Sequence, residues 1–195
     1  SAYTIDFLSG IYSEIGFSTA PKRFGGGGLD ASSDESEGAA SGSINTFIQF
    51  ATGTVNPSII TNDAWRIPYT NIRRVNILLR NLPNAKFGPT IKTRVNGEAR
   101  FLRAYYYFIM LEHYGGVTLM GDNIFSASDA IPSARNTYKE CVDYIVSECE
   151  AIKPLLRVEP VADPDLGRIT RGASFALKAR VLIYAASPLY NGGGI

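Results

Sequence analysis

The sequence contains little of what most metal, redox and nucleophilic sites require. It has a single histidine, His113, so no second imidazole is available to share a metal ion or to serve as an alternative base in a Ser-His-Asp arrangement. Its two cysteines, Cys141 and Cys149, lie in a segment with helical periodicity, where their spacing separates the Cα atoms by about 12 Å. This distance is too long for a disulfide. We therefore expect two buried, unpaired thiols.

An excess of charge and long apolar runs are also missing. Nineteen Lys and Arg residues against eighteen Asp and Glu residues leave a formal charge of +1, which favours neither nucleic acid nor an anionic membrane as a partner. No charge-free apolar run has the roughly 20 residues that a membrane span needs, and the first residues show no signal-peptide pattern. With 195 residues, 45% of them hydrophobic, the chain can bury one sizeable core.

The most informative stretch, residues 97–116, reads GEARFLRAYYYFIMLEHYGG. From Ala99 onward its charged side chains are Arg100, Arg103 and Glu112, and it contains no Pro or Gly before the final Gly-Gly pair. The pattern predicts a helix that is buried on nearly every side, with these three residues on a narrow exposed edge. The Gly-Gly pair would end the helix, because glycine can adopt the left-handed conformation that closes a C-terminus.

Apolar residues at helical spacing predict further helices on both sides of this stretch. They cover residues 1–16, 44–52, 63–82, 138–152 and 173–186.

Three residues of the 63–82 helix have particular expected roles. Asp63 would be the N-cap, and Pro68 would either occupy the first helical position or kink the helix. Asn76 lies beside the apolar stripe, so we expect a buried amide bonded to a neighbouring helix or loop. Trp65 is expected to be a packing anchor, because its spacing places it beside Tyr69 and Ile72.

The two later helices show opposite patterns. The exposed face of helix 138–152 is expected to carry a set of ordinary surface charges: Lys139, Glu140, Asp143, Glu148 and Glu150. Helix 173–186 is rich in alanine, which would allow a neighbouring helix to approach closely, and Thr170 would be its N-cap.

Residues 17–62 are predicted to be mostly loop, because Gly, Ser, Ala and Asp dominate much of this part. The run Gly25–Gly28 does not indicate a phosphate-binding loop, since no strand precedes it and no Gly-Lys-Ser/Thr follows. The acidic residues Asp34, Glu35 and Glu37 lack the apolar surroundings and fixed geometry that a glycosidase carboxylate pair needs. We therefore expect no catalytic residues, no enzyme activity, no metal site and no cofactor.

A weak internal repeat links two parts of the chain. The triplet Leu102-Arg103-Ala104 corresponds to Leu177-Lys178-Ala179, at about twice the 34-residue period of tetratricopeptide (TPR) repeats. The repeat predicts antiparallel helix hairpins, one over residues 63–116 and another over residues 136–190, stacked into a curved solenoid.

Three motifs in order resemble the SusD/RagB family of glycan-binding outer-membrane lipoproteins of Bacteroidetes. The central run GEARFLRAYYYFIMLEHYGGVTL is similar to the signature helix of the family. The upstream WRIPYTNIRRVN resembles its W…Y..I…N helix, and the downstream GRITRGASFALKAR resembles its GR.T..AA.ALKAR helix. The resemblance spans residues 34–191.

The resemblance implies an all-α fold of TPR-like helix hairpins in a curved solenoid with long irregular loops. It also implies that residues 1–195 form a single N-terminal helical domain, with the C-terminal part of the family absent. Family members are surface-exposed and lipid-anchored in the outer membrane, through a signal and a lipidated cysteine that this chain does not contain. They capture an oligosaccharide or polysaccharide and deliver it to a SusC-like TonB-dependent transporter.

In such proteins, loops before the W…Y helix contribute to the glycan site, and the matching ranges here are residues 30–37 and 47–62. Sugars bind through exposed aromatic rings and polar side chains on loops over a rigid scaffold. The expected glycan-binding residues are Asp34, Glu35, Phe50 and Asn56.

Two other functions remain open at this stage. A helical-repeat scaffold could bind a partner protein on its concave face without recognising sugar. A glycosidase would be indicated only if the purified chain released product from a polysaccharide.

Overall fold

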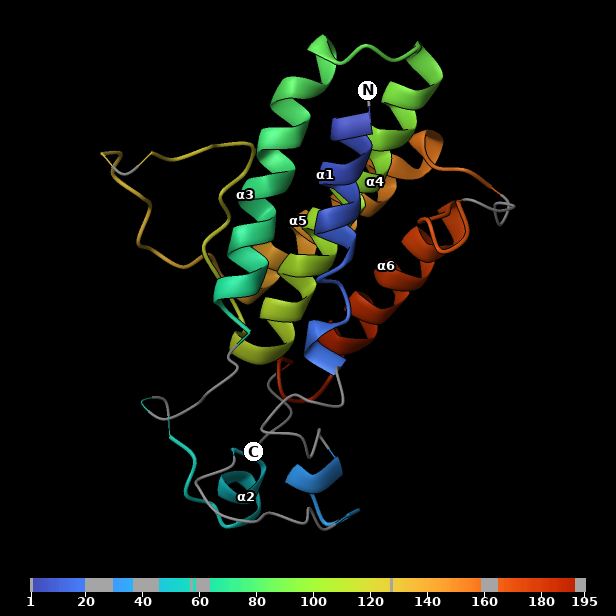
Figure 1. Ribbon diagram of the computed structural model, residues 1–195. Helices are drawn as coiled ribbons and strands as arrows, with labels where there is room; N and C mark the ends of the chain where they lie inside the picture. Colours follow the sequence, from blue (N-terminus) through green and yellow to red (C-terminus); the bar gives the residue numbers. More distant parts are fainter. Residues whose placement is uncertain are drawn as a thin grey trace.

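The computed structural model describes residues 2–19, 30–36, 46–56, 58, 64–126, 128–158 and 165–191. Within these ranges, regular secondary structure is helical, apart from one isolated parallel bridge between Arg157 and Thr170 (Figure 1). The helices are α1 (Ala2–Tyr12), α2 (Thr46–Ala51), α3 (Arg66–Asn81), α4 (Pro89–Tyr114), α5 (Tyr138–Ile152) and α6 (Arg171–Ala185). Short 3-10 turns form η1 (Phe17–Thr19), η3 (Asp30–Ser32), η4 (Leu82–Asn84) and η5 (Lys153–Leu155).

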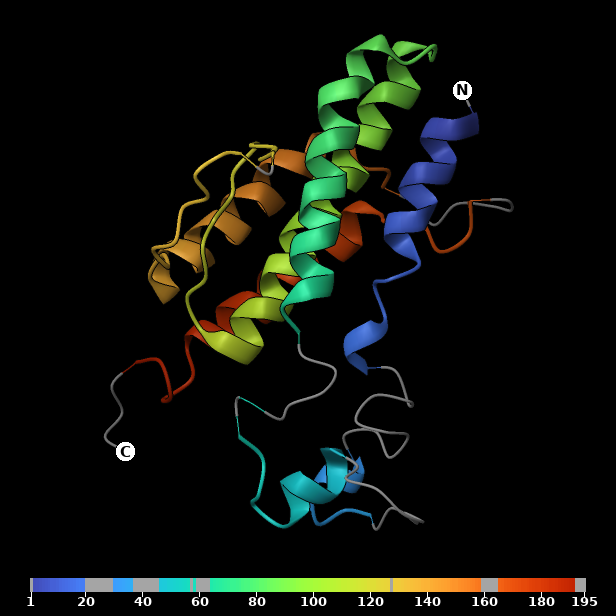
Figure 2. The same cartoon turned by 60° about the vertical axis from the view of Figure 1, so that its left-hand side comes forward.

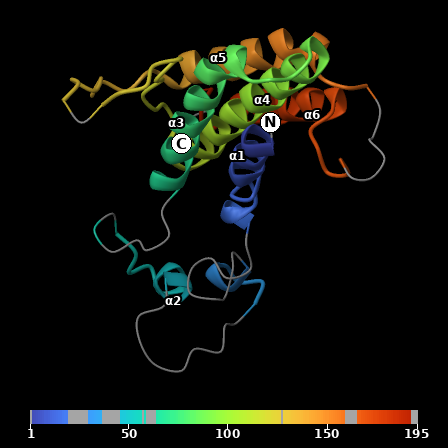
Figure 3. The same cartoon turned by 45° about the horizontal axis from the view of Figure 1, so that its top comes forward.

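The long helices pack in chain order, α3 on α4, α4 on α5 and α5 on α6, and α1 lies against both α3 and α4 (Figures 1 and 2). This arrangement confirms the predicted all-α fold of TPR-like helix hairpins. The short helix α2 packs with η3 in a separate small unit, beyond the ends of the long helices in Figure 3. How the chain divides into domains stays a prediction.

Helix α4 is the centre of the core, as its sequence predicts. Its buried side chains lie between Val95 and Leu111, and the hydrophobic cluster around them includes residues from α1, α3, α5 and α6. The helix begins at Pro89, eight residues earlier than the stretch 97–116 indicated, because Gly88 and Pro89 provide a favourable start. It ends at Tyr114, and Gly115 is the C-cap, so the predicted glycine does follow the helix. Its φ of 70° is positive, as expected, but its ψ of −133° lies outside the left-handed helical region that the prediction named.

The predicted exposed edge of this helix is wrong. Arg103 is buried, with 4% of its side chain exposed, and Arg100 is largely covered. Both guanidinium groups bind Glu148 of α5: Arg100 in a bidentate pair at 2.6 and 3.0 Å, and Arg103 at 3.2 Å. Glu148 is therefore a buried ion-pair partner and not one of the surface charges predicted for helix 138–152.

Burial by itself would raise the pKa of Glu148, but the hydrogen bonds and charges of Arg100 and Arg103 outweigh it and lower that pKa. A carboxylate whose pKa is lower in the folded than in the unfolded state stabilises the fold above its unfolded pKa, and this contribution disappears as the pH falls through the folded pKa. The interaction of Glu148 with the two arginines thus stabilises the protein at neutral pH.

We expect Glu148→Ala to lower the free energy of unfolding by about 3 kcal/mol at pH 7, because it removes the carboxylate that pairs with Arg100 and leaves the buried Arg103 with only the exposed Asp122 as a charged partner. Chemical denaturation measures the difference, which should narrow below about pH 4 as the wild-type carboxylate becomes protonated. Asp143→Ala, on the same helix, is the control, because it breaks an exposed pair with Lys139. Equal stabilities of wild type and Glu148→Ala at pH 7 would contradict the conclusion that the ion pairs of Glu148 stabilise the protein.

Helix α3 begins differently from the prediction. Trp65 takes the N-cap position without a side-chain cap, whereas Asp63, the predicted cap, lies outside the described residues. Pro68 is the third residue of the helix, neither at its first position nor in its interior. Proline is tolerated there because the first four backbone N–H groups of a helix have no intrahelical acceptor.

The ends of the other helices follow local chemistry. At α5, Thr137 and Glu140 form a capping box, with each side chain bonded to the backbone N–H of the other residue. Thr170 is at the N-cap of α6 as predicted, but its side chain makes no cap hydrogen bond. Helix α1 ends at Tyr12 and gives way to turns, four residues short of the predicted 1–16 range.

Helix α6 presents an apolar outer face. Ser174, Leu177 and Val181 face the core. The five alanines expected to permit close approach divide: Ala173 and Ala185 pack against the core, whereas Ala176, Ala179 and Ala186 are exposed. Large apolar side chains on this face are exposed as well, and the exposed fraction of Ile183 is 72%. No helix among the described residues is long and apolar enough to cross a bilayer.

Both cysteines are free and buried, as their spacing predicted. Burial raises the pKa of the Cys149 thiol to about 11, and it also raises the pKa of Cys141.

Because the thiolate is the reactive form, we expect neither cysteine to react with Ellman's reagent at about pH 8 in the native protein. In denaturant both should react, which is the internal control. Rapid release of one equivalent of chromophore from the native protein would contradict the burial of these thiols.

Candidate functional site

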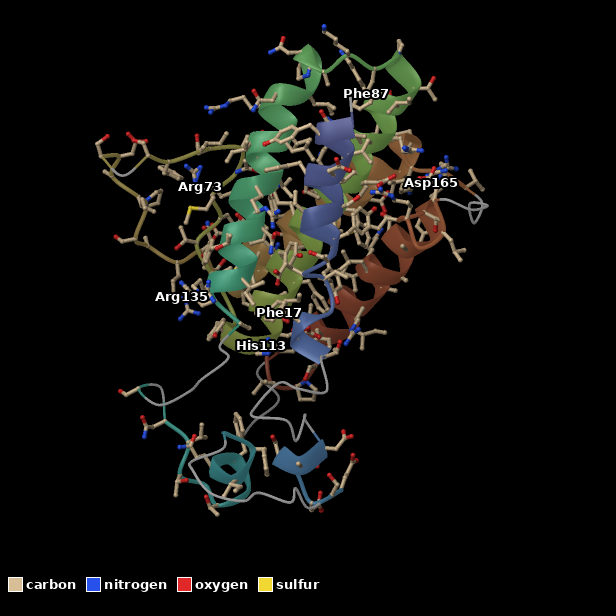
Figure 4. The ribbon with its side chains drawn as sticks, in the orientation of Figure 1. Phe17, Arg73, Phe87, His113, Arg135 and Asp165 are labelled. Carbon is tan, nitrogen blue, oxygen red and sulfur yellow. The ribbon has the colours of Figure 1, made fainter. Side chains whose placement is uncertain are left out.

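A cavity of about 470 Å³ lies between α3 and the connection from α4 to α5, residues 117–136. Figure 4 shows this connection as a long excursion beside α3, with Arg73 between the two. The volume falls within the range of small-molecule sites. The cavity is lined by Trp65, Tyr69, Ile72, Arg73 and Asn76 from α3, and by Thr118, Met120, Asn123, Phe125, Ile131, Pro132 and Ser133 from the connection.

Buried side chains of α3 and α4 hold the near part of this connection. The Tyr69 hydroxyl donates to the carbonyl of Thr118 at 2.9 Å, and the Tyr107 hydroxyl accepts from the backbone N–H of Met120 at 2.8 Å. The amide of Asn76 donates to the carbonyls of Gly121 and Asn123, both at 2.9 Å. Asn76 is thus the buried amide that its position in the sequence predicted.

The two ends of the connection meet at Gly116. Asn136 donates its backbone N–H to the carbonyl of Val117, and its side chain accepts from the N–H of Leu119. A Cβ atom on Gly116 would stand 2.1 Å from the carbonyl oxygen of Asn136. Arg135 also donates to the carbonyls of Tyr114 and Gly116, which places a cation at the C-terminus of α4 (Figure 4).

We expect Gly116→Ala to destabilise the protein by roughly 3 kcal/mol and to open the connection, because the added methyl group meets fixed backbone. Thermal melting and proteolysis within residues 117–136 measure the two effects. Gly172→Ala is the control: its new Cβ has only an ordinary contact, so helix propensity should leave stability equal or higher. An unchanged melting temperature for Gly116→Ala would argue against this close approach.

Aromatic rings form one end of the cavity. Trp65 is 38% exposed and contacts Tyr69 and Tyr114 edge to face, with ring centroids 5.1 and 5.2 Å apart. Tyr114 in turn accepts a hydrogen bond from the backbone N–H of Ala64 at 3.0 Å. Trp65 is therefore a packing anchor, as predicted, and it also exposes part of its ring beside the cavity.

Polar groups accompany the aromatic end. Arg73 is exposed, and Asn123 and Ser133 contribute amide and hydroxyl groups from the connection. Burial raises the pKa of Tyr69, so its hydroxyl stays protonated at neutral pH and keeps its hydrogen bond to the Thr118 carbonyl. An apolar ring surface with a few convergent polar groups is suited to bind a neutral polar ring such as a sugar.

The four residues predicted from the sequence lie elsewhere. Asp34 and Glu35 are exposed just after η3, and Phe50 is a half-buried residue of α2 that packs against the cluster of Ala31 and Phe47. Asn56 is exposed and accepts a hydrogen bond from the N–H of Ser58 at 3.0 Å. The packing of η3 on α2 brings these segments into one small unit, but none of the four residues lines the cavity beside α3.

Sequence reasoning missed this cavity because the 117–136 connection has no periodic pattern. One signal was available, since Trp65, Tyr69, Ile72, Arg73 and Asn76 recur at helical spacing on one side of α3. That spacing is equally typical of a helix face buried in a core. Whether such a face is buried or lines a cavity depends on the path of the connection across it.

Comparison with known proteins identifies the family. The model of a SusD-like family, described as starch-binding and associating with the outer membrane, matches residues 29–183. No curated protein matches the chain.

Solved structures show the same fold over most of this chain. A SusD-like protein from Bacteroides fragilis has 27% identity and a TM-score of 0.73, covering 94% of this chain and 35% of its own length. A laminarin-binding SusD-like protein has 23% identity and a TM-score of 0.76, with coverages of 94% and 40%. Surface glycan-binding protein A from Bacteroides thetaiotaomicron, in complex with laminarihexaose, has 20% identity and a TM-score of 0.53, with coverages of 65% and 26%.

The chain thus spans 26% to 40% of the length of these three solved structures. The fold of stacked helix hairpins and the family match over residues 29–183 lead to the same conclusion: the chain belongs to the SusD-like family.

Proposed function

We propose that this chain is part of a non-catalytic cell-surface protein that binds an oligosaccharide or polysaccharide and delivers it to a SusC-like TonB-dependent transporter for nutrient uptake. In this proposal, a lipid anchor holds the protein at the outer membrane. Membership of a family described as starch-binding and outer-membrane-associated supports the proposal. So do the laminarin-binding and laminarihexaose-bound relatives, which share the fold.

The observation that carries the proposal is the exposed Trp65 ring at the end of the α3 cavity. A sugar ring that lay with its C–H face on Trp65 would have Tyr69 beside it and the polar groups of Arg73 and Asn123 within the same cavity. Hydrogen bonds between α3 and the connection fix Tyr69 and the backbone at Asn123, so little ordering of these two residues would accompany binding.

A second contact with the glycan is proposed for the unit of η3 and α2. Asp34, Glu35 and Asn56 are exposed there, and Phe50 is half-buried. Carboxylate and amide groups accept and donate hydrogen bonds to sugar hydroxyls.

One observation favours the alternative of a protein-docking scaffold without sugar recognition. The outer face of α6 exposes Phe175, Leu182 and Ile183, which is typical of a surface that contacts protein. The two functions are compatible in one molecule, because the cavity beside α3 contains no residue of α6.

We expect Trp65→Ala to weaken oligosaccharide binding about tenfold or more, which corresponds to the loss of one stacking surface. Calorimetry over a panel of plant, host and microbial glycans measures binding, both for this chain and for any longer natural protein that contains it. Trp65→Phe should retain most of the affinity, and Phe175→Ala, which removes an exposed ring on α6, should retain all of it. Melting curves separate a loss of binding from a loss of folding.

Two results would contradict the proposal. Binding of no glycan by either protein would favour the docking scaffold, and undiminished binding by Trp65→Ala would move the site away from α3. The combined variant Asp34→Asn with Glu35→Gln tests the second contact, which is wrong if affinity for every glycan in the panel is unchanged.

A further inference from the structure

A second cavity, of about 540 Å³, adjoins the first along the same side of α3, and Asn76 belongs to the walls of both. Its character is different, because charged side chains replace the aromatic rings. The charged residues that line it are Arg80, Arg100, Arg103, Asp122 and Glu148.

The carboxylates of this second cavity are already engaged. Glu148 binds both Arg100 and Arg103, and Asp122 accepts a hydrogen bond from Arg103. Arg80 takes part in none of these pairs, so the cavity carries one cation in excess.

Arg73 and Arg80 are the two cations of α3 that face these cavities without a partner. Both are exposed, and within the described residues neither side chain forms an ion pair or a hydrogen bond. They are two turns apart with Asn76 between them, so all three lie on one side of the helix, over about 10 Å. Figure 4 shows Arg73 projecting from α3 toward the 117–136 connection.

This excess of positive charge is local. Four arginines and two carboxylates line the two cavities together, whereas the whole chain has a formal charge of only +1. Unpaired guanidinium groups bind carboxylate and sulfate oxygens through charge-assisted and often bidentate hydrogen bonds. The hydroxyl groups of a neutral sugar also accept hydrogen bonds from guanidinium groups, but they carry no negative charge to pair with this excess.

We propose that the two cavities form one glycan groove along α3 that selects acidic saccharides, with a sugar ring at Trp65 and Tyr69 and a carboxylate or sulfate ester at Arg73 and Arg80. The inference rests on the proposed glycan-binding function and narrows it to one class of ligand. Arg100 and Arg103 form the fixed floor of the basic half, because Glu148 and Asp122 hold them in place.

The test compares matched acidic and neutral ligands. The first pair is an oligogalacturonate and the same oligosaccharide with its carboxyl groups reduced to alcohols, and the second is a laminari-oligosaccharide with and without sulfate esters. Calorimetry with the purified chain, and with any longer natural protein containing it, measures the affinity for each. The two pairs distinguish a carboxylate from a sulfate as the preferred anion.

We expect at least one acidic ligand to bind about tenfold or more tightly than its neutral counterpart, with a preference that shrinks between about 50 mM and about 500 mM salt. The double variant Arg73→Gln with Arg80→Gln should abolish the preference, because it removes the two unpaired charges. The affinity for the acidic ligand should fall much more than the affinity for the neutral ligand, which loses at most a hydrogen bond to Arg73. Lys86→Gln is the control: it removes an exposed positive charge that lines neither cavity, so the preference should persist.

Two kinds of negative result would overturn different proposals. Equal binding of both members of each pair, or a preference that survives in the double variant, would overturn the selection of acidic saccharides and leave the glycan-binding function standing. Failure of every ligand in these pairs and in the wider glycan panel to bind would overturn both proposals.

Discussion

Between Val95 and Leu111, α4 is largely buried, and the rest of the structure depends on partners for the charged side chains that this burial removes from water. Removing a charged group from water is costly unless a partner replaces the lost hydration. Glu98 is 1% exposed, and it accepts a hydrogen bond from the Tyr12 hydroxyl at 2.8 Å and lies 3.5 Å from Arg168. Arg103 meets its partners on α3, α5 and the 117–136 connection. Charges on one helix thereby fix the positions of the elements that surround it.

The same network shapes the candidate site. Arg103 donates to the side-chain oxygen of Asn76 at 2.8 Å, and both residues bind the carbonyl of Gly121. The floor of the cavities and the path of the connection are therefore set by bonds that also stabilise the core. Binding residues in such a frame are held in place before a ligand arrives, which reduces the entropy lost on binding.

Two surfaces lie outside this frame. The unit of η3 and α2 has its own small cluster of Ala31, Phe47 and Phe50, whereas the outer face of α6 leaves large apolar side chains in water. The first surface offers carboxylate and amide groups, and the second offers apolar area. A protein that captures a polar ligand and also contacts other protein needs both kinds of surface.

The sequence by itself determined where the helices lie, that α4 and both cysteines are buried, and that a glycine follows the end of α4. It also determined the buried amide of Asn76. These features were predictable because periodicity and local backbone chemistry act over a few residues. Its motifs also identified the family. Tertiary structure alone decided that Arg103 and Glu148 are buried as partners, and that Trp65, Arg73 and Asn76 face a cavity. A charged residue on a helix has the same local pattern whether it faces water or a partner 45 residues away, and an aperiodic connection shows its course only when it is folded against the helix.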